Sequence, residues 1–394
     1  MIIFKRRIVI LTLAVVGVVV LSSVSGGLTG AWMARRVLPP ESQKSFFHLP
    51  NATTTGQAAQ AATSTAEIHL VAMQMNDYGT RMVPETIFNR RSPVAILYFN
   101  KKGSAGESSL TQDEEVGRAA AVTADGWFVT TLSVMDGWHT ADLSLWYDGH
   151  AYRVEQSIFD TATQAVFLKT PAKDLSVTPF ADIWANRTGL AAWLEPSALE
   201  FVPSSILALR ASLQNEPRSS ERSDRRLVAL GELLKAENGT PVWDAKGAMI
   251  GIVDSRANGR LLLIPGSALS ASLQSLVSNG QVRHATLGVY VMDRTLVRST
   301  VEDKTMPERG AWLREDKKTG RAIIKDSPAE KANLKSGDVI LQVDRDILDG
   351  GSDLSDIILQ YQPGANVSLR VWRTGKEMDV PVTLGTQVTS QPLP

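Results

Sequence analysis

The sequence predicts a mainly β protein in which two folded domains follow an N-terminal membrane segment. Short runs of alternating apolar and polar residues, bounded by Gly, Asp, Asn or Pro, recur from residue 67 to the C-terminal end. From residue 284 onward, two short helix patterns join these runs, and a long charge-free run lies close to the N-terminus. A chain of 394 residues is long enough for about two to three domains.

The composition excludes several classes of function. The 41 basic and 41 acidic residues leave no net charge, so the chain lacks the basic surface that is typical of a nucleic-acid-binding protein. The absence of cysteine excludes disulfides, thiolate metal sites and cysteine nucleophiles. The 5 histidines lie far apart without metal-ligand spacing. We therefore expect no metal and no cofactor.

Residues 1–36 predict a single membrane-spanning anchor. No charged residue occurs from Ile8 to Ala34, and Lys5–Arg7 precede this run, which places the N-terminus in the cytoplasm and both domains outside it. A cleavable signal peptide is the alternative, because Ser23–Ser25 offers small residues for cleavage. The apolar run continues to Met33 and ends in a pair of arginines, which favours the uncleaved anchor.

Residues 37–66 are rich in Thr, Ala and Gln and have almost no bulky apolar side chain, so they predict a flexible linker. Residues 67–283 then predict a barrel or a sandwich of short strands. The clearest strand patterns are residues 94–99, 127–129, 165–168 and 261–264.

One helix interrupts the strand pattern near the end of this first domain. Ser267 is the expected N-cap and Gly280 the expected C-terminal residue. The apolar face expected between them consists of Leu269, Leu273, Leu276 and Val277.

Residues 284–388 predict a compact second domain. Ser327 caps a short helix whose first residue is Pro328, and a second helix is expected from Asp353 to Gln362. Alternating apolar residues then predict a hairpin that turns at Thr374–Gly375.

The segment SPAEKANLKSGDVI, from Ser327 to Ile340, with LGVYV upstream, resembles the PDZ domain of the bacterial HtrA-type proteases. Asn333 stands where that family usually has glycine, and asparagine tolerates the left-handed conformation. The resemblance implies an α+β PDZ fold.

Three upstream segments resemble the trypsin-like protease domain of the same family, in the same order. GRAAAVTADGWFVTTLSVM corresponds to the region of the catalytic histidine, FDTATQAVFLKT to that of the aspartate, and ENGTPVWDAKGAMIGIV to that of the serine. The resemblance implies a trypsin-like double β-barrel followed by the PDZ domain.

The catalytic positions nevertheless differ from those of a protease. Ser133 stands in place of the general base, Gln164 in place of the carboxylate and Asn238 in place of the nucleophilic serine. Acyl transfer needs a hydroxyl that an imidazole deprotonates and a carboxylate that orients the imidazole. Thr240 and Glu237 also alter the loop where negative charge would develop. We therefore expect a degenerate, inactive site.

Two other residues are candidates to replace the missing catalytic chemistry. His139 follows Ser133 by six residues, but a histidine in that position is expected to lie in a surface loop. Lys235 could form a pair with a neighbouring hydroxyl only if burial lowered its pKa, and its surroundings do not indicate burial.

The PDZ resemblance implies a peptide-binding groove. A glycine-containing loop would bind the C-terminal carboxylate of a peptide, and the strand after it would pair with the peptide backbone. The expected loop and strand residues are Leu287, Gly288, Val289, Tyr290 and Val291. The expected walls of the apolar pocket are Leu354, Ile357 and Ile358, although residues of such a helix also serve the domain core.

The predicted function is that of a membrane-anchored, inactive HtrA-like protein of the bacterial cell envelope that binds peptides or protein C-termini as a scaffold or regulator. Candidate partners are an active HtrA-type relative and further copies of the chain in a homo- or hetero-trimer, and no nucleic acid is expected. The alternatives are an envelope serine endopeptidase acting on misfolded proteins, which rests on fold alone, and a chaperone-like binder of unfolded chains.

Overall fold

The chain divides into two units, Met1–Gln74 and Met75–Pro394. The computed structural model describes residues 83–90, 93–99, 110–177, 179–181, 188–198, 200–208, 216–223, 225–234, 237–297, 306–351 and 353–393. The predicted anchor, the predicted linker and Lys235 lie outside these residues. Among the described helices, none is both long and apolar enough to cross a membrane.

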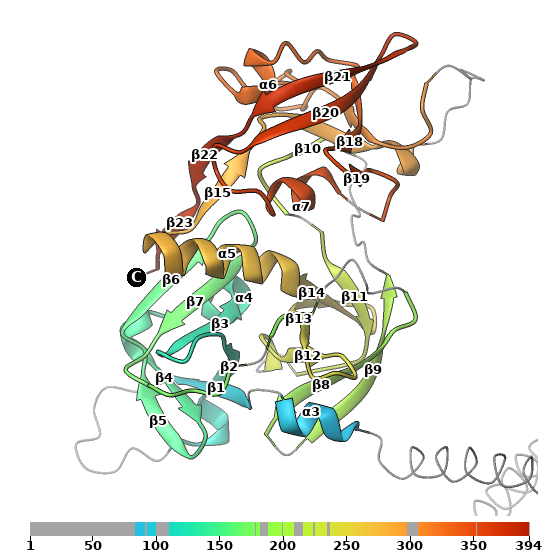
Figure 1. Cartoon of the computed structure of the whole chain (residues 1–394). Coiled ribbons are helices and arrows are strands. Elements are labelled where there is room, and N and C mark those ends of the chain that lie inside the picture. Colours follow the sequence, from blue (N-terminus) through green and yellow to red (C-terminus); the bar gives the residue numbers. More distant parts are fainter. Residues whose placement is uncertain are drawn as a thin grey trace, which may run out of the picture. The chain divides into compact units, whose positions relative to one another are not determined.

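An eight-stranded antiparallel sheet forms the first part of the second unit (Figure 1). Its strand order is β23-β6-β7-β3-β2-β1-β4-β5. The strands are β1 (Val94–Phe99), β2 (Glu115–Ala121), β3 (Trp127–Thr131), β4 (Leu143–Tyr147), β5 (His150–Arg153), β6 (Gln156–Asp160), β7 (Ala165–Lys169) and β23 (Ser390–Pro392). The short helices of this part are α3 (Glu85–Arg90), η2 (Gln112–Glu114), α4 (Leu132–Met135) and η3 (Thr140–Asp142).

A closed six-stranded barrel follows, with the order β11-β14-β13-β12-β8-β9. Its strands are β8 (Ala191–Ser197), β9 (Glu200–Ala208), β11 (Leu227–Leu230), β12 (Pro241–Trp243), β13 (Met249–Ala257) and β14 (Arg260–Pro265). Apolar side chains of both sheets meet in a shared core that includes Phe167, Trp243 and Ile264. Each of these three side chains is fully buried, which agrees with the apolar strand patterns of the sequence.

The helix after the barrel, α5 (Gly266–Asn279), starts earlier than predicted. Its N-cap is Pro265, so the assignment of Ser267 as the cap was wrong. The chain enters the helix directly from β14, and the backbone of Gly266 packs closely on the carbonyl groups of Met249 and Ile250. Gly280 ends the helix with a φ of 68°, as predicted. Of the expected apolar face, Leu269 and Leu276 are buried, Leu273 is partly buried and packs against the same core, and Val277 is 61% exposed.

The PDZ region contains a seven-stranded sheet and a small strand pair. The sheet has the order β10-β16-β17-β18-β20-β21, with β19 added on β18. Its strands are β10 (Arg218–Ser219), β16 (Tyr290–Asp293), β17 (Ala311–Leu313), β18 (Val339–Val343), β19 (Asp346–Ile347), β20 (Asn366–Arg373) and β21 (Lys376–Thr383). β15 (Arg283–Thr286) pairs with β22 (Gly385–Val388), and η5 (Arg294–Leu296) follows β16. Strand β10 therefore comes from a loop of the preceding barrel.

Local signals account for the helices of the PDZ region. Ser327 caps α6 (Pro328–Lys331) by accepting a hydrogen bond from the Glu330 N–H, and Asn333 has a φ of 58°, as expected. The second helix, α7 (Leu354–Ile358), is shorter than the predicted span to Gln362 because the residues after Leu359 form turns.

Candidate functional site

The fold brings two of the three predicted catalytic positions into contact. Ser133 lies in the short helix α4, after β3, and Asn238 lies in the loop before β12. The Asn238 side-chain amide donates to Ser133 Oγ over 3.3 Å. The two positions at which the trypsin-like family has its base and its nucleophile are therefore adjacent here, as the resemblance implies.

Ser133 is fully engaged in hydrogen bonds. Its hydroxyl donates to the backbone carbonyl of Asp254 over 2.6 Å. Because its single proton is used there, its oxygen accepts from the Thr131 hydroxyl at 2.8 Å and from Asn238. A neutral hydroxyl is a very weak base, and the oxygen of Ser133 already accepts hydrogen bonds. Ser133 therefore cannot take a proton from a nucleophile.

The side chain of Gln164 forms a hydrogen bond within its own turn. Its backbone has a φ of 71°, and its side-chain amide donates to the carbonyl of Thr161 over 3.2 Å. Its carbonyl accepts the N–H of Leu132, the residue before Ser133, at 3.3 Å. Gln164 thus supports the position of α4 through the backbone and carries no charge that could stabilise an imidazolium.

The loop around Asn238 is held by its backbone. The N–H of Arg118 donates to the Asn238 carbonyl over 2.7 Å, and the Gly239 N–H donates to Val253 O over 2.8 Å. Gly239 has a φ of 84°, and a Cβ at this residue would lie 2.0 Å from the carbonyl oxygen of Arg118. The glycine is therefore required by packing. Among the described residues, the buried Asn238 Oδ1 has no hydrogen-bond partner.

The carboxylate of Glu237 binds the N–H of Leu234 at 2.5 Å, and its carbonyl accepts from the Thr240 hydroxyl at 2.6 Å. Both residues that depart from the family pattern therefore stabilise the loop locally. His139 is exposed and precedes η3, and no hydrogen bond links it to Ser133 in the part of the chain that is described. The side chains of Ser133 and Asn238 contact hydroxyls, amides and backbone carbonyls.

A buried carboxylate that sequence reasoning missed lies behind the turn of Gln164. Asp160 Oδ2 accepts from Ser272 at 2.7 Å and lies 2.9 Å from His284 Nε2. Burial acts to raise the pKa of Asp160, but the hydrogen bond and charge of His284, together with Ser272, outweigh it and lower the pKa to about 2. Because the carboxylate stands between the serine and the imidazole, the imidazole cannot deprotonate the serine, and Ser272 is fully buried. The cluster is structural.

The predicted carboxylate-binding loop has the backbone geometry that the resemblance implies. Gly288 has a φ of 84°, and the N–H groups of Leu287 and Gly288 both donate to one oxygen, Oε1 of Glu221, at 3.1 and 2.6 Å. A Cβ at Gly288 would lie 2.2 Å from the Cβ of Ser327, so a β-branched residue there would also disturb the fold. The loop is thus able to bind a carboxylate, and one from this chain is bound to it.

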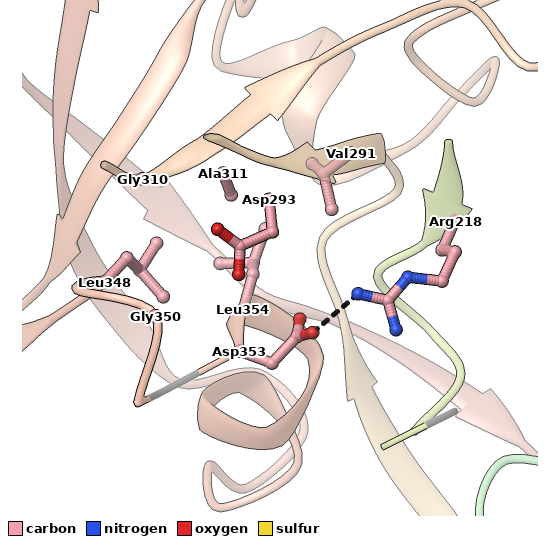
Figure 2. Close-up of a pocket in the computed structure, with 9 residues that line it drawn as sticks. All are labelled: Arg218, Val291, Asp293, Gly310, Ala311, Leu348, Gly350, Asp353 and Leu354. Atoms are coloured by element: carbon pink, nitrogen blue, oxygen red, sulfur yellow. Dashed lines mark hydrogen bonds and ion pairs between the residues drawn. The ribbon is translucent and has the colours of Figure 1, made fainter. Parts of the chain in front are cut away.

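The residues predicted for the groove divide between the binding edge and the core. Tyr290 and Val291 pair with β10 through their backbones. Val289, Leu354, Ile357 and Ile358 are buried in the core of the PDZ region, and of these only Leu354 lines the small pocket of Figure 2. Sequence reasoning missed the residues Arg218, Glu221 and Asp353, because their contacts join segments far apart in the chain.

Figure 2 shows the acidic end of this groove. Arg218 points towards Asp353, the N-cap of α7, and the two side chains form an ion pair at 2.8 Å. Asp293 lines the same pocket. Its carboxylate accepts from the N–H and the hydroxyl of Thr295, so Asp353 is the carboxylate that binds the basic side chain of β10.

Comparisons with known proteins agree with this geometry. The family model for the PDZ domain matches residues 281–384. "Probable periplasmic serine endoprotease DegP-like" of Halomonas elongata is 28% identical over 301 residues, which cover 73% of this chain and 60% of that protein. "Serine protease Do-like HtrA" of Bacillus subtilis is 24% identical over 298 residues, which cover 71% of this chain and 66% of that protein. The chain thus spans 60% of the length of the Halomonas relative.

Solved structures show the same fold. "HtrA-type protease AlgW with decapeptide" has a TM-score of 0.53 at 20% identity and covers 77% of this chain and 98% of that one. "HtrA-type protease AlgW with tripeptide" has a TM-score of 0.52 at 23% identity, covering 77% and 96%. These findings show a PDZ domain at residues 281–384 and a mainly β, trypsin-like fold, and they support a relation to the HtrA-type, PDZ-containing serine proteases.

Proposed function

Given the relation to HtrA-type, PDZ-containing serine proteases, we propose that this chain is a catalytically inactive member that binds peptides or protein C-termini through its PDZ domain and acts as a scaffold or regulator in the cell envelope. The observation that carries the proposal is the contact between Asn238 and Ser133, in which an amide and a hydroxyl occupy the positions of nucleophile and base. Gln164 completes the substitution without a charge.

The expected loss of activity is large because the catalytic residues of a serine protease act as a unit. Removing any member costs most of the rate enhancement, about 10⁴-fold to 10⁶-fold. Here all three positions differ, and the surrounding groups are already engaged with one another. No described side chain at the site supplies a base for the missing imidazole.

The binding function draws on the loop at Leu287 and Gly288. Its two N–H groups converge on a carboxylate oxygen, which is the interaction that a peptide C-terminus would make. The AlgW structures contain a decapeptide and a tripeptide, which makes a peptide the natural class of ligand to test here. An extended peptide would pair with β16 by strand addition.

The anchor and the assembly belong to the same proposal. Residues 1–36 would hold the protein in the membrane with both domains outside the cytoplasm. The chain would assemble as a homo-trimer, or as a hetero-trimer with an active HtrA-type relative. Protease added to spheroplasts should digest the barrel and the PDZ region. Digestion only after the membrane is broken would contradict this orientation.

The experiment that tests the function uses the full chain in detergent. It should leave unfolded casein intact under conditions in which trypsin digests it. A library of peptides with free C-terminal carboxylates should give selective binders that lose affinity when their C-termini are amidated. Casein cleavage, or equal binding of free and amidated peptides, would contradict the proposal.

A further inference from the structure

The binding edge of the PDZ sheet is already occupied by a segment of the same chain. Strand β10 pairs antiparallel with β16, with Arg218 opposite Val291 and Ser219 opposite Tyr290. The pairing continues beyond the strand, since the Ser220 N–H donates to Val289 O over 2.9 Å and the Val289 N–H donates to the Ser220 hydroxyl oxygen over 3.2 Å. This is strand addition, the mode by which PDZ domains take up peptides.

The segment also runs in the direction of a bound peptide and ends in a carboxylate. From Arg218 it proceeds along β16 towards the loop at Leu287, where Glu221 Oε1 accepts both loop N–H groups. The hydroxyl of Ser220 donates to the same oxygen at 2.9 Å, and that of Ser219 donates to Oε2 at 2.5 Å. The side chain of Glu221 thus takes the place of a terminal carboxylate, with Ser220 in the place of the last residue.

Charges on α7 fix the two ends of this segment. Arg218 pairs with Asp353 at 2.8 Å, and the two side chains are 12% and 9% exposed. Beyond Glu221, Arg225 pairs with Asp356 at 2.9 Å, and Ser223 donates to the same carboxylate at 2.9 Å. Ion pairs this far from water hold their geometry tightly, because separating either partner leaves an unpaired buried charge.

We infer that residues 218–221 are an intramolecular ligand of the PDZ groove, which an external peptide of the same chemistry must displace. This inference rests on the proposed peptide-binding function and deepens it by assigning the ligand class: a free C-terminal carboxylate, a small last residue, and a basic residue two positions before it. The basic residue faces Asp353, and the carboxylate faces the N–H groups of Leu287 and Gly288.

An open cavity of about 560 Å³ lies beside the occupied groove. Glu221 of the segment and the adjacent Arg222 line it, together with Gln164 and Tyr290. Displacement of the segment would therefore remove part of the wall of this cavity.

Occupation of the groove by residues 218–221 has a measurable effect. The smaller the fraction of molecules whose groove is open, the weaker is the apparent affinity for an external peptide. The probe is a fluorescent peptide with the sequence of residues 212–220 and a free C-terminal carboxylate, titrated into the full chain in detergent. Glu221→Gln removes the charge that occupies the loop, and Arg218→Ala removes the anchor on α7. Each variant should bind the probe about tenfold or more tightly than the parent.

Glu232→Gln is the matched control, because Glu232 is exposed and lies after the segment on the same chain stretch. It should bind like the parent, and the amidated probe should bind no variant. Equal affinity of parent, Glu221→Gln and Arg218→Ala would overturn the internal ligand while leaving peptide binding intact.

Hydrogen exchange separates this failure from a failure of the proposed function. In the parent, the amides of residues 287–291 should exchange slowly, and Glu221→Gln should speed the exchange of Leu287 and Gly288 even without peptide. Unchanged exchange would overturn the internal ligand. Faster exchange with no probe binding by any variant would support the internal ligand and reject the groove as a site for external peptides.

Discussion

The old catalytic site and the PDZ groove are both filled by side chains of this chain, but in different ways. At the catalytic site, neutral groups bind one another, with Asn238 donating to Ser133 and Ser133 donating to Asp254 O. In the groove, charged groups make the contacts, with Glu221 on the loop amides and Arg218 on Asp353. The comparison teaches that the contacts of the predicted catalytic site are neutral, whereas those of the occupied groove are made by charges that would also recognise a ligand.

The largest effect should come from breaking the charged side of this comparison. Burial raises the pKa of Asp356, the nearby Asp353 adds to this rise, and Arg225 opposes it. Arg225→Met leaves that carboxyl buried without its partner and should lower the free energy of unfolding by about 3 kcal/mol. Urea denaturation of the full chain measures this.

The double variant Arg225→Met with Asp356→Leu is its control. Replacing both charges by apolar side chains should recover most of the lost stability, because no unpaired charge remains. If the single and the double variants are equally destabilised, the ion pair is not what holds the segment to α7.

The next largest effect is expected from acid, at the buried carboxylate of Asp160, outside both regions. The pKa of Asp160 falls from its ordinary value of 3.8 to about 2, so its ionised form stabilises the fold by about 2 kcal/mol above pH 4. This contribution is lost as the pH falls from about 4 to about 2. Over this range the unfolded state takes up a proton on Asp160, whereas the folded state does so only near pH 2. Unfolding followed by circular dichroism across this range should show the loss.

Asp160→Asn keeps the shape of the side chain and removes its titration. Its stability should change less between pH 4 and pH 2 than that of the parent. The same pH dependence in both proteins would show that other carboxylates are responsible.

A smaller effect is expected at the neutral site. Ser133→Ala leaves Asp254 O without its donor and should lower the free energy of unfolding by about 1 kcal/mol, with no change in peptide binding. Ser204→Ala, which removes a comparable bond to Leu230 O at the surface, should cost less. A change in peptide affinity for Ser133→Ala would mean that the two regions are coupled.

The smallest effect should come from an exposed ion pair. Arg370 Nε on β20 and Asp379 Oδ1 on β21 lie 3.3 Å apart, and the two side chains are 50% and 63% exposed. Water screens such a pair, so Arg370→Ala should change the free energy of unfolding by less than about 0.5 kcal/mol. A loss comparable to that of Arg225→Met would contradict the assumption that burial gives the groove contacts their strength.

The sequence predicted those features that depend on neighbouring residues. The capping by Ser327, the left-handed Asn333 and the hairpin turn at Thr374–Gly375 follow from local chemistry, and the structure contains each of them. The predicted start of α5 was wrong. The helix begins where Gly266 packs closely on β13, and not at the polar residue Ser267.

For the candidate site, too, the sequence predicted only what depends on neighbouring residues. The assignment of Ser133, Gln164 and Asn238 rests on flanking segments that resemble the family, and the structure brings Ser133 and Asn238 into contact. The occupant of the groove could not be predicted, since Glu221 and Gly288 lie 67 residues apart and only the folded chain joins them. The pairing of Asp160 with His284, 124 residues apart, has the same origin.

The central claim is that the barrel carries no serine-protease chemistry, and covalent labelling tests it most directly. The full chain is incubated with a serine-directed fluorophosphonate beside trypsin, and the intact masses are recorded. Because Asn238 cannot act as an activated serine and Ser133 has no base, the account predicts no adduct on this chain while trypsin is labelled completely. Stoichiometric labelling of any serine would contradict it.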